Sequence, residues 1–279
     1  MKRFIFSLLA LMAVTLVSLT LTACGDDGDG GGSGSGGSGG SSSNTGTFQG
    51  AKRVFGNNLV KAFGQEGYDR YEFTYDSKGF VTRVHRTRYE TSSSNTEYDL
   101  YITYNENVVI NTYKDGALQG TSTINIGSNG FASSFTYGNE VNTLSYNSDN
   151  QLTAITYSHN NKTEVNSYTY SGGNITQSAW DGEVESNIAY TSPTQSAITN
   201  IAGVMEYDNA MGIDMDDYQL AYYFGLAGFG TKNLPLAYTD SHSTTKNTWT
   251  LDAIGRATKV VVEKTSYGST STKTFFWEY

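Results

Sequence analysis

A short phrase that recurs along the chain limits its possible fold more than any other feature. In residues 73–81, FTYDSKGFV, an alternating apolar and aromatic run leads into a four-residue polar turn, and a second extended run follows. The pattern repeats in residues 124–135, 144–155 and 249–260, with a shortened copy in 168–175. Gly or Asn closes each full turn, as a positive φ angle at that position requires. Each copy therefore predicts a β-hairpin.

The apolar residues after each turn do not keep to one parity. They follow the reference residue of each copy by six and nine positions, as Val81 and Val84 follow Tyr75. A flat strand would place two such residues on opposite faces, so either the strand carries a bulge or both faces are partly covered. The matching pairs in the other full copies are Ala132 and Phe135, Leu152 and Ile155, and Ala257 and Val260.

A long meander that bends and curls back over itself meets this requirement. The hairpin count predicts an all-β fold, a large curled antiparallel β-meander that is open and barrel-like, with about 12 to 16 strands. We expect it to form a single β domain over residues 48–279, because a chain of this length suits one large β domain better than two small ones. The turn pattern alone fits both an open and a closed sheet.

One stretch, near 194–236, breaks the strand rhythm and predicts a short helix and a loop. In residues 213–225, IDMDDYQLAYYFG, Asp214 suits the N-cap of the helix, and Asp216 and Asp217 suit the positive end of its dipole. Gly225 suits its termination. We expect the apolar side of this helix to plug the concave side of the sheet. The residues on that side would be Leu220, Tyr223 and Phe224.

The N-terminus carries a different kind of signal. Lys2 and Arg3 precede an apolar stretch, and Cys24, the single cysteine, follows the residues Leu-Thr-Ala. The stretch is long enough for a membrane-spanning helix as well as for a removable signal, and a structural cysteine would need a partner that the chain lacks. The arrangement resembles the lipobox of bacterial lipoproteins. The resemblance implies that residues 1–23 are a signal peptide and that Cys24 is the acylated mature N-terminus.

Residues 24–47 predict a flexible tether. They are rich in Gly and Ser and offer almost nothing to bury, so they cannot offset their chain entropy. A Gly/Ser coil of about twenty residues spans on the order of 25 Å, enough to hold a domain clear of lipid headgroups. The acidic residues Asp26, Asp27 and Asp29 resemble the surface-export signal of Bacteroidota lipoproteins. A merely soluble tether, with the protein on the periplasmic face of the membrane, is the alternative.

The charge of the chain argues against nucleic acid as a partner. Removal of Lys2 and Arg3 with the signal peptide lowers the 18 basic residues to 16, against 27 acidic ones. A surface with this balance repels phosphate backbones and anionic lipid headgroups. We therefore expect contact with the membrane to come through the lipid anchor.

The hairpin turns of the form Tyr-Asp-x-x-Gly are similar to the YD repeats of bacterial wall-associated and toxin-shell proteins. The whole layout resembles more closely a family of Bacteroidota lipoproteins that is known as a domain of unknown function with a porin-like fold. The lipobox, the tether, the turn at 75–79 and the late segment GTKNLP at 230–235 carry this resemblance, which extends over most of residues 50–279. It implies a fold and a compartment and supplies no catalytic residues.

Candidate catalytic and metal-binding residues are sparse. His85, His159 and His242 lie far apart and show no zinc-binding spacing, so we interpret them as surface residues, although triads do assemble from distant residues. Oxygen ligands for calcium gather at Asp208, Asn209, Asp214, Asp216 and Asp217. These residues lack the Asp-x-Asp-x-Asp-Gly phrase and the closing Glu of a strong calcium loop, and helix capping explains the last three of them. We expect no cofactor.

Three other features are ambiguous between structure and binding. The loop at 225–230, GLAGFG, matches no phosphate or dinucleotide fingerprint and predicts a flexible loop. A basic cluster could hold a sulfated or acidic glycan, although a solvated strand face is the simpler interpretation; it comprises Lys78, Arg83, Arg86 and Arg88 around His85 and Tyr89. The 21 tyrosines suit sugar stacking but are also favoured on any half-buried sheet.

The sequence thus supports three functional hypotheses. The first is a non-catalytic, lipid-anchored domain of the outer membrane, exposed at the cell surface, that binds or scaffolds a glycan or an envelope protein. The second is a glycan-binding accessory lipoprotein, which requires aromatic side chains along one groove. The third is an enzyme that acts on an envelope polymer or polysaccharide, which requires convergent carboxylates that the sequence does not reveal.

Overall fold

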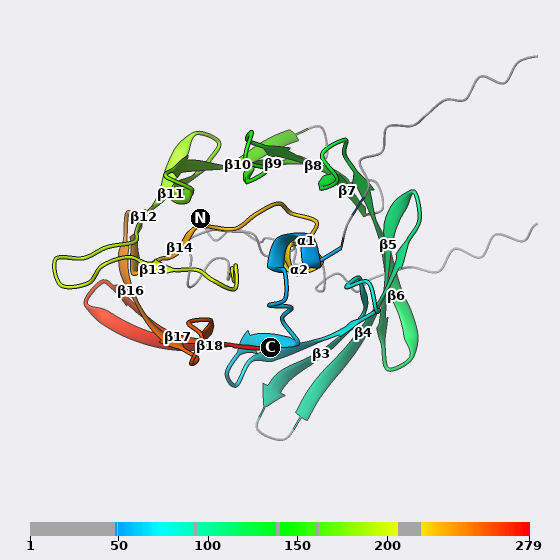
Figure 1. Cartoon of the computed structure of the whole chain (residues 1–279), viewed down its shortest axis with the longest axis horizontal. Helices are drawn as coiled ribbons and strands as arrows, with labels where there is room; N and C mark the ends of the chain where they lie inside the picture. The colour runs from blue at the N-terminus through cyan, green and yellow to red at the C-terminus, as the bar shows by residue number, and fades with distance from the viewer. Residues whose placement is uncertain (1–47, 49, 92–93, 138–139, 160–161, 206–218) are drawn as a thin grey trace, which may run out of the picture. The chain divides into compact units, whose positions relative to one another are not determined.

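Antiparallel strands close into a barrel, which Figure 1 shows from one end. The computed structural model describes residues 48 and 50–279, apart from 92–93, 138–139, 160–161 and 206–218. The strands of the barrel are β1 (Ala62–Gln65), β2 (Asp69–Tyr75), β3 (Val81–Thr91), β4 (Ser94–Tyr104), β5 (Asn107–Lys114), β6 (Ala117–Ile126), β7 (Ala132–Tyr137), β8 (Glu140–Tyr146), β9 (Leu152–His159), β10 (Lys162–Ser171), β11 (Asn174–Trp180), β12 (Glu183–Ala189), β15 (Ala237–Thr239), β16 (Ser243–Leu251), β17 (Ala257–Ser266) and β18 (Ser269–Glu278).

Each strand of this barrel pairs with its neighbours in the sequence, except where β12 passes directly to β15. The first strand closes the ring, because β1 pairs with β2 on one side and with β18 on the other. Phe63 of β1 thus lies between Tyr71 and Trp277 in the register of the sheet. The predicted antiparallel meander of 12 to 16 strands is confirmed: sixteen strands form it, and its two ends meet.

Every copy of the repeated phrase contains a β-bulge, at the point where its two extended runs pair beside the turn. The register of the ladder shifts by one residue where Tyr75 pairs with Val81, and again at the corresponding place in each other copy. Of the two explanations that the parity of the apolar residues allowed, the structure thus shows the bulge. The other shifts lie at Ile126 and Ala132, Tyr146 and Leu152, Tyr170 and Ile175, and Leu251 and Ala257.

The predicted turn chemistry is also confirmed. In the first copy, one carboxylate oxygen of Asp76 accepts the backbone N–H groups of Lys78 and Phe80, both at 2.9 Å, and Gly79 has a φ of 90°. Asn147 and Asp252 fold their turns by the same pair of bonds. The residues that close the other full turns also have positive φ angles; they are Gly130, Asn150 and Gly255.

Part of the tyrosine excess has a structural role, mostly beside these turns. Five buried or half-buried tyrosines donate their hydroxyl hydrogens to a backbone carbonyl of a neighbouring segment, at 2.7–2.9 Å. Burial raises the pKa of each phenol, so each stays a neutral donor. The pairs are Tyr75 with Val60, Tyr104 with Val81, Tyr146 with Ala132, Tyr190 with Ile175, and Tyr279 with Ala257. Val81, Ala132 and Ala257 each open a strand directly after a repeat turn, and Ile175 is the second residue of such a strand.

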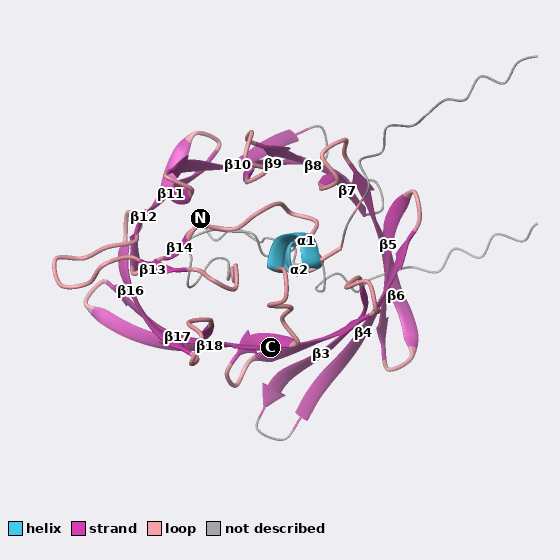
Figure 2. Cartoon of the chain, in the orientation of Figure 1, coloured by secondary structure: helices cyan, strands magenta, loops and turns pink. Residues whose placement is uncertain are grey.

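In the part of the chain that the structure describes, two short helices lie inside the ring of strands (Figure 2). They are α1 (Lys52–Phe55) and α2 (Gln219–Tyr223), and a separate two-stranded sheet joins β13 (Ile198–Thr199) to β14 (Asn233–Leu234). We call residues 50–61, 190–205 and 219–236 the plug. No helix in the described part of the chain combines the length and the apolar character that a membrane crossing needs.

The predicted helix corresponds to α2, and its end was placed correctly. Gly225 has a φ of 79° and donates its N–H to Tyr222 O, while Leu226 N–H donates to Ala221 O, the paired bonds of a Schellman cap. Of its predicted apolar side, Tyr223 and Phe224 are fully buried, and Leu220 is half-buried. The predicted N-terminal part of the helix, with Asp214, Asp216 and Asp217, lies outside the described residues.

Tyr223 joins the plug to the barrel wall by ring stacking and hydrogen bonds. Its ring stacks on Phe63 of β1 with centroids 4.4 Å apart and on Phe55 of α1 at 5.8 Å. Its hydroxyl accepts the indole N–H of Trp277 at 2.7 Å and donates to Met205 O at 2.5 Å. Aromatic pairs and a satisfied buried hydroxyl together make a firm junction. The plug therefore supplies the core of the barrel on this side, as the sequence predicted for the helix.

Candidate functional site on the inward face

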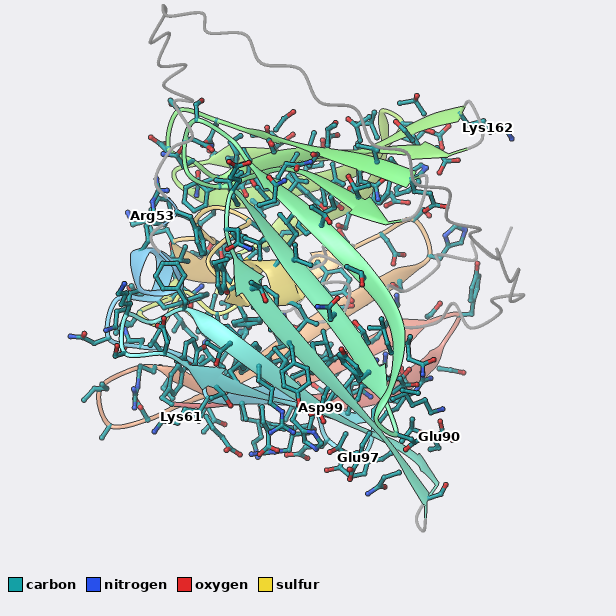
Figure 3. The ribbon with its side chains drawn as sticks, turned by 90° about the vertical axis from the view of Figure 1, so that its right-hand side faces the viewer. Arg53, Lys61, Glu90, Glu97, Asp99 and Lys162 are labelled. Atoms are coloured by element: carbon teal, nitrogen blue, oxygen red, sulfur yellow. The ribbon has the colours of Figure 1, made fainter. Side chains whose placement is uncertain are left out.

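The plug divides the barrel into two unlike ends. The repeat turns and the plug lie at one, the plugged end, and the hairpins between β3 and β4, β5 and β6, β9 and β10, and β17 and β18 turn at the other, the far end. In Figure 3, Arg53 and Lys61 mark the plugged end, and Glu90 and Lys162 mark the far end.

Backbone hydrogen bonds join the plug to one turn after another. Arg53 of α1 also donates a side-chain bond to Asn129 O at 2.8 Å and lies over the Phe131 ring at 4.0 Å. The backbone bonds run from Ala51 N–H to Gly79 O, Ala132 N–H to Leu226 O, Phe229 N–H to Asn150 O, and Lys232 N–H to Gly173 O. The 225–230 loop, predicted to be flexible, is instead packed: Leu226 is fully buried and Ala227 nearly so, because the loop lies against these turns.

The inward side chains change in character along the strands. Near the plugged end they are apolar, as at Val84 on β3 and Ile124 on β6, and one pleat further toward the far end they become polar, as at Arg86 and Ser122. Buried polar groups are costly unless they have partners, so such a layer suggests a role beyond packing. Its buried members are Asp69, Arg86, Ser122, Asn166, Ser178, Ser186, Thr245 and Asn247.

Within this layer, one row alternates cations and tyrosines across four strands. The register aligns Lys114 of β5 with Tyr98 of β4, Arg86 of β3 and Tyr71 of β2. The Arg86 guanidinium carbon lies 5.0 Å from the Tyr71 ring centroid and 5.9 Å from that of Tyr98, and Lys114 Nζ lies 5.7 Å from Tyr98. These distances are typical of cation–π contacts. Burial raises the pKa of Tyr71, which therefore stays neutral.

Arg86 is buried with incomplete hydrogen bonding. Its side chain is 6 % exposed, and its Nη2 donates to the Asp69 carboxylate at a long 3.3 Å. Its Nε has no hydrogen-bond acceptor among the described residues. A buried guanidinium donor without an acceptor is rare and calls for an explanation, such as a ligand or water that completes the site.

Arg88 lies one pleat further toward the far end. It is opposite Asp69 in the register, yet Asp69 pairs with Arg86, and Arg88 instead donates to the Tyr68 hydroxyl at 3.3 Å and lies over that ring at 5.4 Å. Among the described residues, neither Arg88 nor Lys114 has an ion-pair partner. We call Arg86, Arg88, Lys114, Tyr71 and Tyr98 the cationic ladder.

The structure divides the basic cluster that the sequence placed together. Arg83 and His85 point outward, where Arg83 Nη2 and His85 Nδ1 lie 2.6 and 3.0 Å from one oxygen of Asp99. Burial alone would raise the pKa of Asp99, but the bonds from His85 and Arg83 outweigh it and hold the pKa below its ordinary value. Strand alternation sends Arg86 and Arg88 inward instead. Lys78 is exposed in the first repeat turn.

The histidines do not converge. His85 belongs to β3, His159 to β9, and His242 to the turn between β15 and β16, where its Nδ1 lies 2.5 Å from Ser241 Oγ. In the described ranges, no three His, Cys, Asp or Glu residues are grouped as a metal site requires. Cys24 and the calcium candidates Asp208, Asn209, Asp214, Asp216 and Asp217 lie outside those ranges.

Comparison with solved structures shows that the fold is shared. A crystal structure of a porin-like protein from Bacteroides uniformis is similar with a TM-score of 0.63 at 21 % identity, over 78 % of this chain and 97 % of that one. A porin-like protein from Bacteroides vulgatus gives a TM-score of 0.38 at 15 % identity, over 79 % and 98 % of the two chains. No protein-family model and no curated protein matches the chain. The chain therefore has the barrel fold of the Bacteroides uniformis protein.

Proposed function

We propose that this chain is a non-catalytic, lipid-anchored protein of the outer membrane. Acylated Cys24 holds it to the bilayer, residues 24–47 act as the tether, and the barrel stands clear of lipid at the cell surface, where it binds a ligand. The fold shared with a porin-like protein supports an envelope location. The observation that carries the proposal is the polarity of the outward face.

Charged groups lie on the outward face of the strands. Arg83, His85 and Asp99 form one cluster across β3 and β4. Arg70 on β2 forms a second, because it donates to Glu72 at 3.1 Å and binds both oxygens of Glu278 at 2.8 Å. The outward residues of β16 add Thr244, Lys246, Thr248 and Thr250.

A barrel immersed in lipid needs the opposite surface. Its outward residues form an apolar band about 25 Å tall, and a charge at the centre of that band costs about 2–4 kcal/mol for Arg or Lys. The cluster of Arg83, His85 and Asp99 lies well inside β3 and β4, within the height of such a band, and therefore argues against immersion. An outward face that suits water, on a chain whose N-terminus resembles a lipobox, instead supports attachment through a lipid anchor.

The carboxylates support a binding role over a catalytic one. Glycoside hydrolysis uses two facing carboxyl groups about 5–10 Å apart, one of which must be kept protonated. Among the described residues, Asp69 is the buried carboxylate, and it pairs with Arg86. On the outward face, Asp99 and Glu278 likewise pair with arginines, and the pKa of each lies below its ordinary value. Groups of this kind suit structure and binding better than proton transfer.

The substitution Cys24→Ser in the full chain tests the anchor, because the thiol is the acyl acceptor. We expect the unaltered protein to fractionate with membranes and to carry acyl mass at residue 24, whereas the variant is released in folded form without detergent. Ser33→Ala in the tether is the matched control and should stay with the membrane. A Cys24→Ser variant that has lost residues 1–23, as its mass shows, and still remains in the membrane until detergent extracts it would refute the proposal and favour an immersed barrel.

A further inference from the structure

We propose that the cationic ladder is a binding site for an anionic saccharide, a sugar that carries carboxylate or sulfate groups. The inference rests on the proposed function as a binding protein and names the ligand class and the site. The three cations lie on β3 and β5, the two strands that flank β4, on the inward face. They face the interior of a chain that is acidic overall, with a formal net charge of −9.

The charges of the ladder are not balanced by its surroundings. Asp69 is committed to Arg86, and it also accepts the Gln65 N–H at 3.2 Å. Glu90, near the tip of the β3–β4 hairpin, accepts the Thr96 hydroxyl at 2.7 Å and forms no ion pair with a described residue. The positive charges of Arg88 and Lys114 therefore remain available to an anion.

The other inward positions beside the ladder are uncharged. Strand alternation places Gln65 of β1, Thr96 of β4, Thr112 of β5 and Gly120 of β6 on the same face. Side chains of this kind donate and accept hydrogen bonds without adding charge, as a hydroxyl-rich ligand requires. The ladder is thus a polar, net-positive surface, because Asp69 balances only one of its three cations.

The geometry of the donors fits an oxyanion. Guanidinium groups present parallel N–H bonds that match carboxylate and sulfate, and the Arg86 Nε is a buried donor that still lacks an acceptor. Arg88 is only half-buried and donates to a neutral phenol, a weak partner that a charged oxygen displaces readily. Lys114 adds a third donor beyond Tyr98.

The tyrosines indicate a sugar rather than a small inorganic anion. Tyr68 leaves 43 % of its surface exposed beside Arg88, so its ring offers a platform next to a cation. Aromatic rings with polar tips pack on the C–H faces of sugars while their hydroxyls bond to the ring substituents. A carboxylated or sulfated saccharide can bring its charged group to the cations and its sugar ring to the Tyr68 ring at the same time.

The test measures binding of defined probes to the purified full-length mature protein by calorimetry. The probes are a hexagalacturonate for carboxylate, a chondroitin sulfate hexasaccharide for sulfate, and maltohexaose as the neutral control. We expect one of the two acidic probes to bind, to lose affinity as salt rises, and to exceed the neutral sugar by about tenfold or more. The acidic probe that binds better identifies the anionic group.

The double variant Arg88→Gln/Lys114→Gln should weaken that binding about tenfold or more. The matched control, Lys246→Gln/Lys259→Gln, removes two positive charges from the outward faces of β16 and β17 and should bind normally. The conservative variant Arg88→Lys/Lys114→Arg should retain most of the affinity. The proposal fails if neither acidic probe binds, if the neutral sugar binds equally well, or if the two double variants lose affinity alike. None of these results depends on Cys24, so they are separable from failure of the anchor.

Discussion

Glycines with the same backbone conformation have different neighbours at the two ends of the barrel. At the plugged end, a Cβ added to Gly225 would lie 2.7 Å from Gly50 O, and one added to Gly228 would lie 2.4 Å from Asn150 O. At the far end, a Cβ on Gly116 or Gly268 would meet nothing within 4 Å, although both have positive φ angles. The positive φ angle is shared, but only the glycines at the plugged end combine it with close tertiary packing.

We infer from this difference that the plugged end stabilises the fold and that the far end is the place for ligand binding. At the plugged end, buried aromatic rings and backbone bonds tie the turns together, so most changes there should unfold the barrel. At the far end, the inner layer is polar, and a Cβ added to the turn glycines Gly116 and Gly268 would meet nothing within 4 Å. Binding residues gather where a rigid scaffold leaves the surface free to vary, which is the situation at the far end. Three substitutions test how sharply the ends differ.

The largest effect is expected from Tyr223→Ala. The change removes the ring that joins Phe55 to Phe63 and leaves the indole N–H of Trp277 without its acceptor. Truncation of a fully buried aromatic residue costs about 3–5 kcal/mol of the free energy of unfolding. Urea denaturation measures it. Tyr267→Ala, at a far-end tyrosine that is 84 % exposed, should change stability by less than about 0.5 kcal/mol. Similar losses of unfolding free energy in both variants would mean that the two ends do not differ in their contribution to stability.

An intermediate effect is expected from Gly225→Ala, compared with Gly268→Ala. Both glycines have φ near 80°, so alanine is strained by about 1 kcal/mol at either site. At Gly225 the new methyl group also meets the backbone of Gly50 and Ala51, at 2.7 and 2.8 Å. Because that backbone belongs to the packed plug, Gly225→Ala should cost at least about 2 kcal/mol more than Gly268→Ala.

Thermal or urea unfolding of the two variants measures this difference directly. Equal destabilisation would mean that the strain of the turn, which both share, decides the cost and that packing at the plugged end adds little.

The local part of the fold was readable from the sequence because it depends on residues close together. Asp76 and Gly79 specify their turn by bonds within five residues, and the parity of Val81 and Val84 already required a bulge or a second covered face. The end of α2 at Gly225 was readable for the same reason. The recurrence of tyrosine was visible too, but its role at the turns depends on carbonyls of neighbouring segments.

The remaining features depend on pairings that no local pattern carries. Closure of the barrel pairs Phe63 with Trp277, which are separated in the sequence by almost the whole domain. No local sequence pattern around either residue indicates this pairing. Helix α1 is a single turn whose position is set by its contacts with α2 and with the first repeat turn. For the candidate site, the sequence found Arg86 and Arg88, but Lys114 and Tyr98 joined them only through the register of β3 to β5. Strict alternation within 83–88 was the one signal that could have separated the outward from the inward residues.

The smallest effect is expected from Glu278→Gln, at the seam where β18 meets β1 and β2. Both oxygens of Glu278 bind Arg70 at 2.8 Å, but the Glu278 side chain is 53 % exposed. An ion pair this open to solvent contributes only about 0.2–1 kcal/mol at neutral pH. The hydrogen bonds from Arg70 hold the pKa of Glu278 below its ordinary value of 4.5. Its contribution is therefore present above that value and is lost as the pH falls through the lowered pKa in the folded state.

Urea denaturation of the protein and of the Glu278→Gln variant at several pH values should show a small gap at pH 7 that closes in acid, well below 4.5. Glu263→Gln on β17, whose carboxylate forms no ion pair with a described residue, is the matched control and should show no such gap. A gap at pH 7 as large as that of Tyr223→Ala would mean that surface charge at the seam, rather than the plug, holds this end closed. Such a result would move the source of stability from the interior of the plugged end to its outer face.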